Sequence, residues 1–268
     1  MNANFPLILA SGSPRRALML REAGFAPQVE AADIDDAAVH LETHSVEELT
    51  LALALFKARR FPLILASGSP RRALMLREAG FAPQVEAADI DDAAVHLETH
   101  SVEELTLALA LFKARRVEMM RRARGAEAAV ILAADTMCAL DGELIGKPSD
   151  AAHADKMIRA FENRPHDVVT AWCIIAPDGS RVLDSDCSIV HVGALTDAQR
   201  AHHLDSGAWK GKAGGYNFPE ALAAGWPVRC EGLWETVVGL PLIRFASVLE
   251  ETLRTGCTAH LRVEGGTA

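Results

Sequence analysis

An exact tandem repeat constrains the fold of this chain more than any other feature of its sequence. Residues 5–60 run from FPLILASGSPRR to LALALFKARR, and residues 61–116 repeat them without a single difference. Repeat folds of the solenoid type need at least three units to bury a continuous core, and their terminal units differ from the rest. Two identical units followed by unrelated sequence therefore indicate either a tandem duplication in the gene or an error in its assembly. Removing one 56-residue copy from the 268 residues leaves 212, a common size for a single α/β domain.

The two copies differ in what can follow them. In the second copy Ser101 and Glu104 form a predicted capping box, and the helix that starts there can continue well beyond the end of the repeat. In the first copy the same helix meets Pro62, which lacks an amide donor and disfavours helical geometry in the residue before it. We therefore expect residues 61–268 to form the working domain and residues 1–60 to be a redundant βα segment, although the first copy could compete for the same place.

The composition is that of a globular protein with no general affinity for polyanions. Half of the residues are hydrophobic, and the formal net charge is −9. Such a chain has no broad electrostatic attraction to nucleic acid or to an anionic membrane, so we expect neither as a partner, and a local cluster of Lys and Arg must meet any anionic ligand. The five cysteines form no C-x-x-C pair, and the sequence shows neither a secretory signal nor an apolar run of about 20 residues. We therefore expect a cytoplasmic protein.

The order of the remaining patterns predicts the α/β class. The apolar run at residues 62–66 predicts a strand that leads through a tight loop into a helix. A second buried strand is expected at residues 129–135, and a helix at residues 151–161. Asp-Gly pairs at residues 141–142 and 178–179 predict two hairpins, whose antiparallel strands would join the parallel ones. We therefore expect a mixed β-sheet flanked by helices.

The loop after the first of these strands has the features of an anion-binding site. Ser69 is a natural N-cap, Pro70 suits the first helical position, and Gly68 lets the backbone turn, so the free amides of the helix start point outward. Arg71 and Arg72 follow in the first turn, where positive side chains are unfavourable beside the positive end of the helix unless an anion accompanies them. A polyphosphate would supply that anion. An ordinary helix cap with two solvated arginines is the alternative.

A second group of polar residues lies at the end of the predicted buried strand. Asp135 and Thr136 end the segment AADT, and Lys147 follows the first predicted hairpin. Ligands of open α/β sheets tend to lie beyond the ends of the strands. A carboxylate there can hold Mg²⁺ or accept a proton from an attacking water, and a lysine can neutralise phosphate charge in the transition state. Taken alone, Asp135 could equally well end the strand or start a turn.

Eight motifs in one order give the chain a specific resemblance. Between about residues 61 and 255 the sequence contains SGSPRR, DIDD, LALFKAR, AADT, GELIGKP, RPH before VVTA, GKAGGY and EGLWETVVGLPL. Together these motifs resemble the Maf family of nucleoside triphosphate pyrophosphatases. The resemblance implies a Maf/ITPase-like fold of two lobes with a central cleft. It also implies hydrolysis of a nucleoside triphosphate to its monophosphate and diphosphate, with a divalent metal cation, Mg²⁺ or Mn²⁺.

The resemblance further implies roles for individual residues. Asp135 matches the family's proton acceptor and, together with Asp92, its metal-binding carboxylates, although Asp92 is one methylene shorter than the usual glutamate. The residues that match the family's substrate-binding groups are Ser67, Ser69, Arg71, Arg72, Lys113 and Lys147. Pro219 departs from the pattern, because many pyrimidine-type members carry a glutamine there. The identity of the substrate therefore stays open, and it could be a modified or non-canonical nucleotide. Glu220 could accept a hydrogen bond from an exocyclic amine of such a base, or it could face solvent.

Two other interpretations stay open. The chain could bind nucleotides without turnover, in keeping with the role in cell division attributed to some members of the family, or it could be an enzyme inactivated by the duplication. The extra βα unit could also promote a homodimer by domain swapping.

Overall fold

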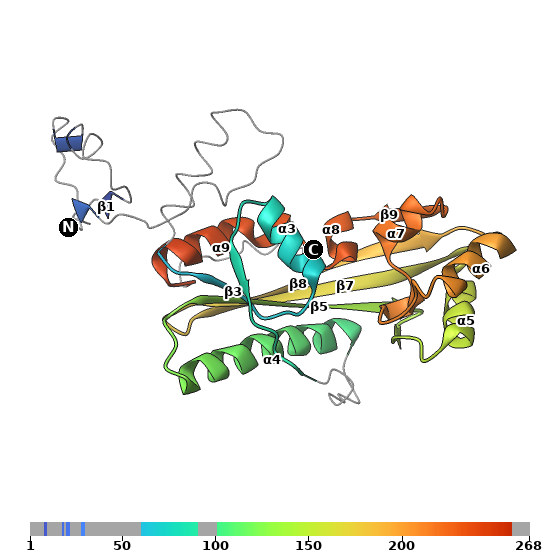
Figure 1. The fold of residues 1–268 in the computed structure, drawn as a ribbon, viewed down its shortest axis with the longest axis horizontal. Helices are drawn as coiled ribbons and strands as arrows, with labels where there is room; N and C mark the ends of the chain where they lie inside the picture. Colours follow the sequence, from blue (N-terminus) through green and yellow to red (C-terminus); the bar gives the residue numbers. More distant parts are fainter. Residues whose placement is uncertain are drawn as a thin grey trace.

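A mixed sheet of seven strands runs through the protein (Figure 1). The computed structural model describes residues 60–90 and 101–258, together with residues 8, 9, 18, 20, 21, 28 and 29. The strands of the sheet are β3 (Leu63–Leu65), β4 (Pro83–Val85), β5 (Val130–Leu140), β6 (Glu143–Ile145), β7 (Arg164–Ile175), β8 (Arg181–Val192) and β9 (Val228–Glu231). Their order is β4-β3-β5-β7-β8-β9, with β6 beside β5. β3 is parallel to β4 and β5, and the other neighbours are antiparallel, so the predicted mixed sheet is confirmed.

Helices flank the sheet in two groups (Figure 1). On one half of the sheet, α3 (Pro70–Glu78) and α9 (Leu242–Thr255) cover one face, and α4 (Val102–Ala123) covers the other. The group at the opposite end includes α5 (Ala151–Phe161), α6 (Asp197–Asp205), the short 3₁₀ turn η3 (Ala213–Gly215) and α7 (Phe218–Ala223), while α8 (Trp234–Val238) precedes α9. In the described ranges no helix is long and apolar enough to cross a membrane.

Local sequence signals determine where the helices begin. The Ser69 hydroxyl accepts a hydrogen bond from the Arg72 amide and caps α3, with proline at the first turn. Ser101 and Glu104 form the predicted capping box of α4, and this helix continues past the end of the repeat to Ala123. Each cap satisfies amides that the first turn of a helix leaves without a partner.

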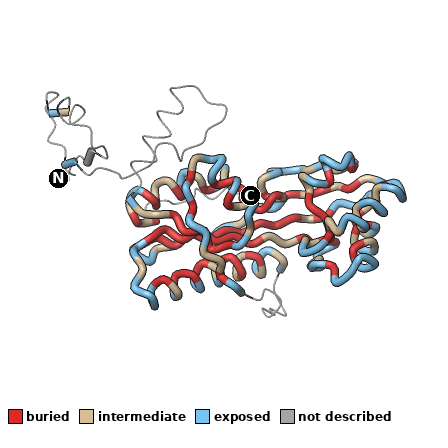
Figure 2. The backbone as a smooth tube through the Cα atoms, in the orientation of Figure 1, coloured by how far each residue is buried: buried red, intermediate tan, exposed pale blue. Residues whose placement is uncertain are grey.

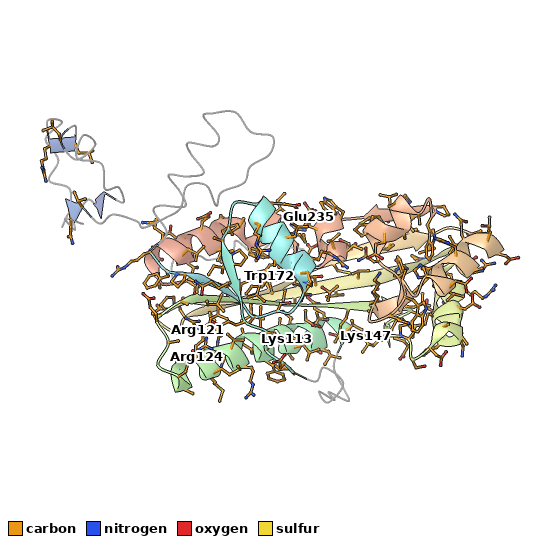
Figure 3. All side chains as sticks on the ribbon, in the orientation of Figure 1. Lys113, Arg121, Arg124, Lys147, Trp172 and Glu235 are labelled. Atoms are coloured by element: carbon orange, nitrogen blue, oxygen red, sulfur yellow. The ribbon has the colours of Figure 1, made fainter. Side chains whose placement is uncertain are left out.

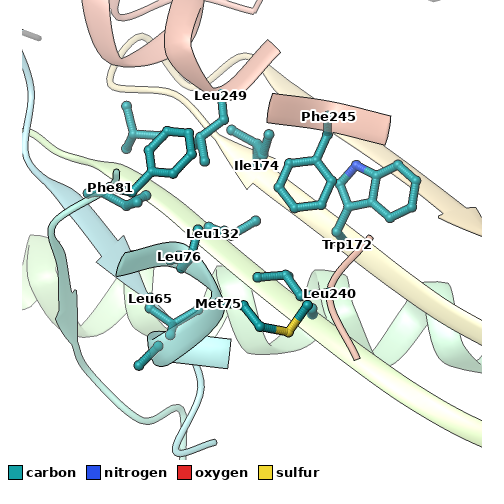
Figure 4. Close-up of a cluster of buried hydrophobic side chains, with 14 of the residues drawn as sticks. Leu65, Met75, Leu76, Phe81, Leu132, Trp172, Ile174, Leu240, Phe245 and Leu249 are labelled. Atoms are coloured by element: carbon teal, nitrogen blue, oxygen red, sulfur yellow. The ribbon is translucent and has the colours of Figure 1, made fainter. Parts of the chain in front are cut away.

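Alternate residues of the strands build two separate cores on the two faces of the sheet. Along β5, Leu132 and Ala134 pack with α3 and α9, whereas Ile131 packs with α4, as the two-residue period of a strand requires. In the first core, Trp172 of β7 stacks on Phe245 of α9 with ring centroids 5.1 Å apart (Figure 4). These two cores attach both layers of helices to the sheet.

The long strands continue from these cores into a third core at the other end of the sheet (Figure 2). There Cys138 of β5 and Val168 of β7 pack with Ile158 and Phe161 of α5 and with Trp226. The chain therefore forms two lobes on one continuous sheet, as expected.

Both predicted hairpins are present. β5 and β6 are joined by Asp141 and Gly142, whose φ angles of 53° and 82° are both positive, as a type I′ turn requires. β7 and β8 pair over twelve positions, which makes their hairpin the longest ladder of the sheet. The helix expected at residues 151–161 has the expected bounds.

The second copy of the repeat supplies β3, α3, β4 and most of α4. In the first copy, β1 (Ile8–Leu9) and β2 (Gln28–Val29) form a separate parallel pair, in the register that β3 and β4 have 56 residues later. Leu76 of the second copy is completely buried, whereas its counterpart Leu20 is partly exposed. The redundancy of residues 1–60 stays a prediction.

Candidate active site

The site begins where one edge of β5 lacks a neighbouring strand. β7 pairs with the other edge along almost the whole of β5. On the first edge, β3 pairs as far as Leu132 and β6 pairs from Cys138 onward. In the described part of the chain, residues 133–137 face no strand on this edge. Asp135 and Thr136 lie in this interval. The prediction that Asp135 ends the strand was wrong. β5 continues to Leu140, because β7 pairs with it from Ile131 to Ala139.

A cleft of about 950 Å³ opens at this interval. One wall belongs to the loop before α3 and to α4, and the opposite wall to β6 and the loop that leads into α7. The polar residues that line it include Ser67, Ser69, Arg71, Arg72, Lys113, Asp135, Thr136, Lys147, Lys212, Tyr216 and Asn217. Apolar side chains such as Met137, Ile145 and Phe218 complete the lining. The expected central cleft between the lobes is thus present.

Arg72 bridges the interval in the sheet from the side. Its Nη1 donates to the carbonyl oxygen of Ala134 at 2.7 Å and to the Ser67 hydroxyl at 3.1 Å. Its Nη2 donates to the Thr136 hydroxyl at 3.0 Å, and its Nε to the carbonyl oxygen of Gly239 at 2.8 Å. The guanidinium therefore joins the loop before α3, the middle of β5 and the turn between α8 and α9.

Arg71 has a different environment from its neighbour. Its Nη1 makes a longer hydrogen bond of 3.4 Å to the carbonyl oxygen of Val238, and its side chain lines the cleft. The Ser69 amide donates to the Ser67 hydroxyl at 3.2 Å, which shapes the loop beside it. The two arginines were expected to act as a pair, but Arg72 makes four hydrogen bonds whereas Arg71 makes one long one.

Lys113 and Asp135 form a close ion pair at the base of the cleft. Lys113 lies on α4 (Figure 3). Its Nζ lies 2.6 Å from Oδ1 of Asp135, and the two side chains are only 13% and 9% exposed. A buried ion pair adds little to stability, because desolvation offsets most of the attraction between the charges. Its position in a cleft is better explained by a function of the carboxylate and the ammonium.

The opposite wall contributes two further lysines. Lys147 follows β6, next to Gly146, whose carbonyl oxygen accepts a hydrogen bond of 3.0 Å from the Gly214 amide. Lys212 lies in the same glycine-rich loop and forms an ion pair with Glu220 of α7. Glu220 is half exposed and does not line the cleft. Of its two interpretations, the solvent-facing residue is therefore favoured over the contact with the base. Lys212 was missed as a site residue, although the motif GKAGGY contains it.

The charge of the cleft is opposite to that of the protein. Its described lining includes five cationic side chains, those of Arg71, Arg72, Lys113, Lys147 and Lys212, and one carboxylate, that of Asp135. The chain as a whole carries a formal charge of −9. A local surplus of cations in an acidic protein selects anionic ligands at this place.

The cleft also contains a thiol, that of Cys138. Burial raises the pKa of Cys138 to about 12, so this thiol stays protonated near neutral pH. Because the thiolate is the nucleophilic form, Cys138 is unsuited to nucleophilic catalysis.

The structure brings together all predicted site residues that it describes, but their roles stay predictions. Asp135, the predicted proton acceptor, and the six predicted substrate-binding residues line one cleft. Asp92, the other predicted metal ligand, lies outside the described residues. Within residues 60–90 and 101–258, no three His, Cys, Asp or Glu side chains are grouped as a metal site.

Comparison with known families gives two matches on this chain. A family model described as Maf-like protein matches residues 6–61 and again residues 62–252. The first match corresponds to the first copy of the repeat, and the second covers the lobes and the cleft.

Similar proteins match this chain over almost their whole length. A dTTP/UTP pyrophosphatase of Ralstonia nicotianae is 36% identical over 197 residues, which are 72% of this chain and 95% of the relative. Proteins of the same description from Hyphomonas neptunium and Caulobacter vibrioides are 39% and 37% identical, over 70% of this chain and 94% and 93% of the relatives. A solved dITP/XTP pyrophosphatase structure from Mycobacterium abscessus aligns with 18% identity and a TM-score of 0.31, over 50% of this chain and 75% of that chain.

Proposed function

Because this chain belongs to the Maf family, we propose that it is a nucleoside triphosphate pyrophosphatase, a hydrolase that acts on the phosphoanhydride between the α and β phosphates. The observation that carries the proposal is the cationic cleft built around Asp135 in an otherwise acidic protein. A triphosphate is the kind of ligand that needs several cations at one place.

In the proposed reaction, water attacks the α phosphorus and diphosphate leaves. The bond from the water oxygen to the α phosphorus forms, and the bond from that phosphorus to the bridging oxygen breaks. Asp135 accepts the proton of the attacking water, a role that requires it to lie within hydrogen-bond reach of that water. Arg71, Lys113 and Lys147 bind the phosphate oxygens and stabilise their negative charge in the transition state. Arg72 holds Thr136 and the α3 loop in place beside them.

We propose that carboxylate oxygens of the cleft hold a divalent cation together with the substrate. Magnesium commonly binds one or two carboxylates together with phosphate oxygens of the substrate, rather than a full cage of protein ligands. Asp135 supplies one carboxylate in the described cleft, and Asp92 is the proposed second one. When bound, Mg²⁺ or Mn²⁺ would neutralise phosphate charge and orient the polyphosphate.

The relatives suggest dTTP and UTP as the first substrates to test, since they are described as dTTP/UTP pyrophosphatases. Pro219, in the first turn of α7, stands against a simple transfer of that preference. A panel of ordinary and modified nucleoside triphosphates therefore belongs to the experiment.

The proposal is tested by diphosphate release from this panel with Mg²⁺ or Mn²⁺, comparing the wild type with Asp135→Asn. We expect turnover by the wild type and a decrease of about 10²- to 10⁴-fold in the variant, as for loss of a general base, with nucleotide affinity retained. Asp184→Asn is the matched control, because Asp184 is an exposed carboxylate of the same sheet, and its turnover should be unchanged. A wild-type protein that binds nucleotides but releases no diphosphate from any of them would refute the proposal and favour a binding protein.

A further inference from the structure

A buried histidine that the proposed reaction does not use lies behind one wall of the cleft. His166 of β7 is 2% exposed, and its imidazole stacks on the ring of Phe161 with centroids 4.1 Å apart. Its Nε2 lies 2.8 Å from the hydroxyl oxygen of Tyr216, within hydrogen-bond distance. Burial, with a smaller contribution from His191, lowers the pKa of His166 to about 4, so the ring is neutral near pH 7.

Tyr216 ends a glycine-rich loop, residues 211–216, that has little freedom where it contacts these rings. A side chain on Gly214 would place its Cβ 2.7 Å from the Phe161 ring, so the backbone of the loop touches the same ring that stacks on His166. Tyr216 also stacks on Trp226, with centroids 5.9 Å apart. His166 and Phe161 therefore hold the loop from the side of the core.

The other side of the same loop lines the cleft. Lys212 and Tyr216 are both part of the cleft lining, and the hydrogen bond from the Gly214 amide to Gly146 connects the loop with the segment that bears Lys147. A displacement of the loop would thus move Lys212, which lies in the loop and lines the cleft. His166 itself is not part of the cleft lining.

We propose that His166 is a positioning residue for nucleotide binding, which acts through Tyr216 to fix the loop of residues 211–216 as one wall of the cleft. The inference rests on the proposed function, because it assumes that the ligand of the cleft is a nucleotide. It assigns to His166 an effect on substrate affinity and none on the attack of water, since Asp135 and Lys113 belong to β5 and α4 and pair with each other rather than with this loop.

The test compares two replacements that differ in one hydrogen bond. In His166→Gln the side-chain amide nitrogen stands close to the former Nε2 and can still meet Tyr216, whereas in His166→Asn it stands close to the former Nδ1 and cannot. Tyr216→Phe removes the same hydrogen bond from the other side. His202→Asn is the matched control, because His202 is an exposed histidine of α6.

The measurements are steady-state kinetics, affinity for a UTP analogue with a methylene bridge between the α and β phosphorus atoms, and amide hydrogen exchange of residues 211–216. For His166→Asn we expect KM and the dissociation constant to rise roughly three- to tenfold, the equivalent of one hydrogen bond, with kcat unchanged. Exchange of the loop amides should accelerate by a similar factor. The glutamine variant should recover most of each change, and the double variant with Tyr216→Phe should be no worse than the more affected single variant.

Unchanged exchange and affinity in His166→Asn would overturn the inference, and so would a decrease in kcat at constant KM. A wild type without turnover would overturn the proposed function alone, because loop exchange and analogue affinity are measured without catalysis.

Discussion

Replacement of Arg72 by lysine should destabilise the protein far more than the same replacement of Arg71. Arg72 makes hydrogen bonds through three different nitrogen atoms, to Ser67, Ala134, Thr136 and Gly239. A lysine carries all its donors on one nitrogen, so it cannot reach partners that are spread around a planar guanidinium. The carbonyl oxygen of Ala134 would then be left in the interval of β5 where, among the described residues, no strand supplies a donor.

The size of the effect follows from the number of lost bonds. A lysine at this position can keep at most about two of the four, and each hydrogen bond to a charged group contributes about 1.5–3 kcal/mol, so Arg72→Lys should cost roughly 3–6 kcal/mol. In a domain of this size about 1 kcal/mol corresponds to 2–4 °C, which predicts a decrease in melting temperature of roughly 10 °C. For Arg71→Lys, which loses a 3.4 Å contact, we expect less than about 0.5 kcal/mol.

Differential scanning calorimetry and urea denaturation of the two variants measure this difference directly. Both changes retain one positive charge and occupy the same helical turn, so differences in net charge and helix propensity cancel. Equal melting temperatures for the two variants would refute the assignment of Arg72 as the residue that bridges the interval in β5.

Three further predictions concern the repeat, the loop and the pH dependence. Deletion of residues 5–60 should leave the melting temperature unchanged, because every strand of the seven-stranded sheet lies in the second copy or after it; a lower melting temperature would show that the first copy supports the fold. Gly214→Ala should lower the free energy of unfolding by about 2–4 kcal/mol in urea denaturation, since its Cβ would lie 2.7 Å from the Phe161 ring and its φ is +67°. In the control Gly211→Ala, φ is +72° but no atom lies near the Cβ, so only about 1 kcal/mol of backbone strain is expected. Because the folded pKa of His166, about 4, lies below its ordinary 6.5, the unfolded chain binds the proton first as the pH falls. Stability should therefore decrease between pH 6.5 and 4 by up to about 3 kcal/mol from this group, and His166→Gln should lack that part of the decrease.

The sequence predicted the elements that have local signals. Ser69, Ser101 and the two Asp-Gly pairs determine helix starts and hairpin turns through neighbouring residues, and these elements were found where expected. The short elements α7, α8 and β9, of four to six residues, were not predicted. They are too short to show a hydrophobic period, and their positions depend on packing against the long strands.

The site shows the same division between local and long-range information. The order of the motifs was sufficient to select seven of the residues that line the cleft, although it missed Lys212. The difference between Arg71 and Arg72 was not predictable, since the partners of Arg72 include residues 62 and 167 positions away in the chain. The link between His166 and Tyr216 spans 50 positions and also has no local signature.

The continuous strands β5, β7 and β8 determine how the cleft can respond to a ligand. Each lobe has its own core, yet the same three strands contribute to both lobes. Domains joined by a linker can rotate about a few backbone angles, whereas these lobes can separate only if a twelve-position ladder twists or breaks. The distance between the lysines of the two walls is therefore set mainly by the twist of the sheet. The positive charges of the cleft thus have their final spacing before a triphosphate binds.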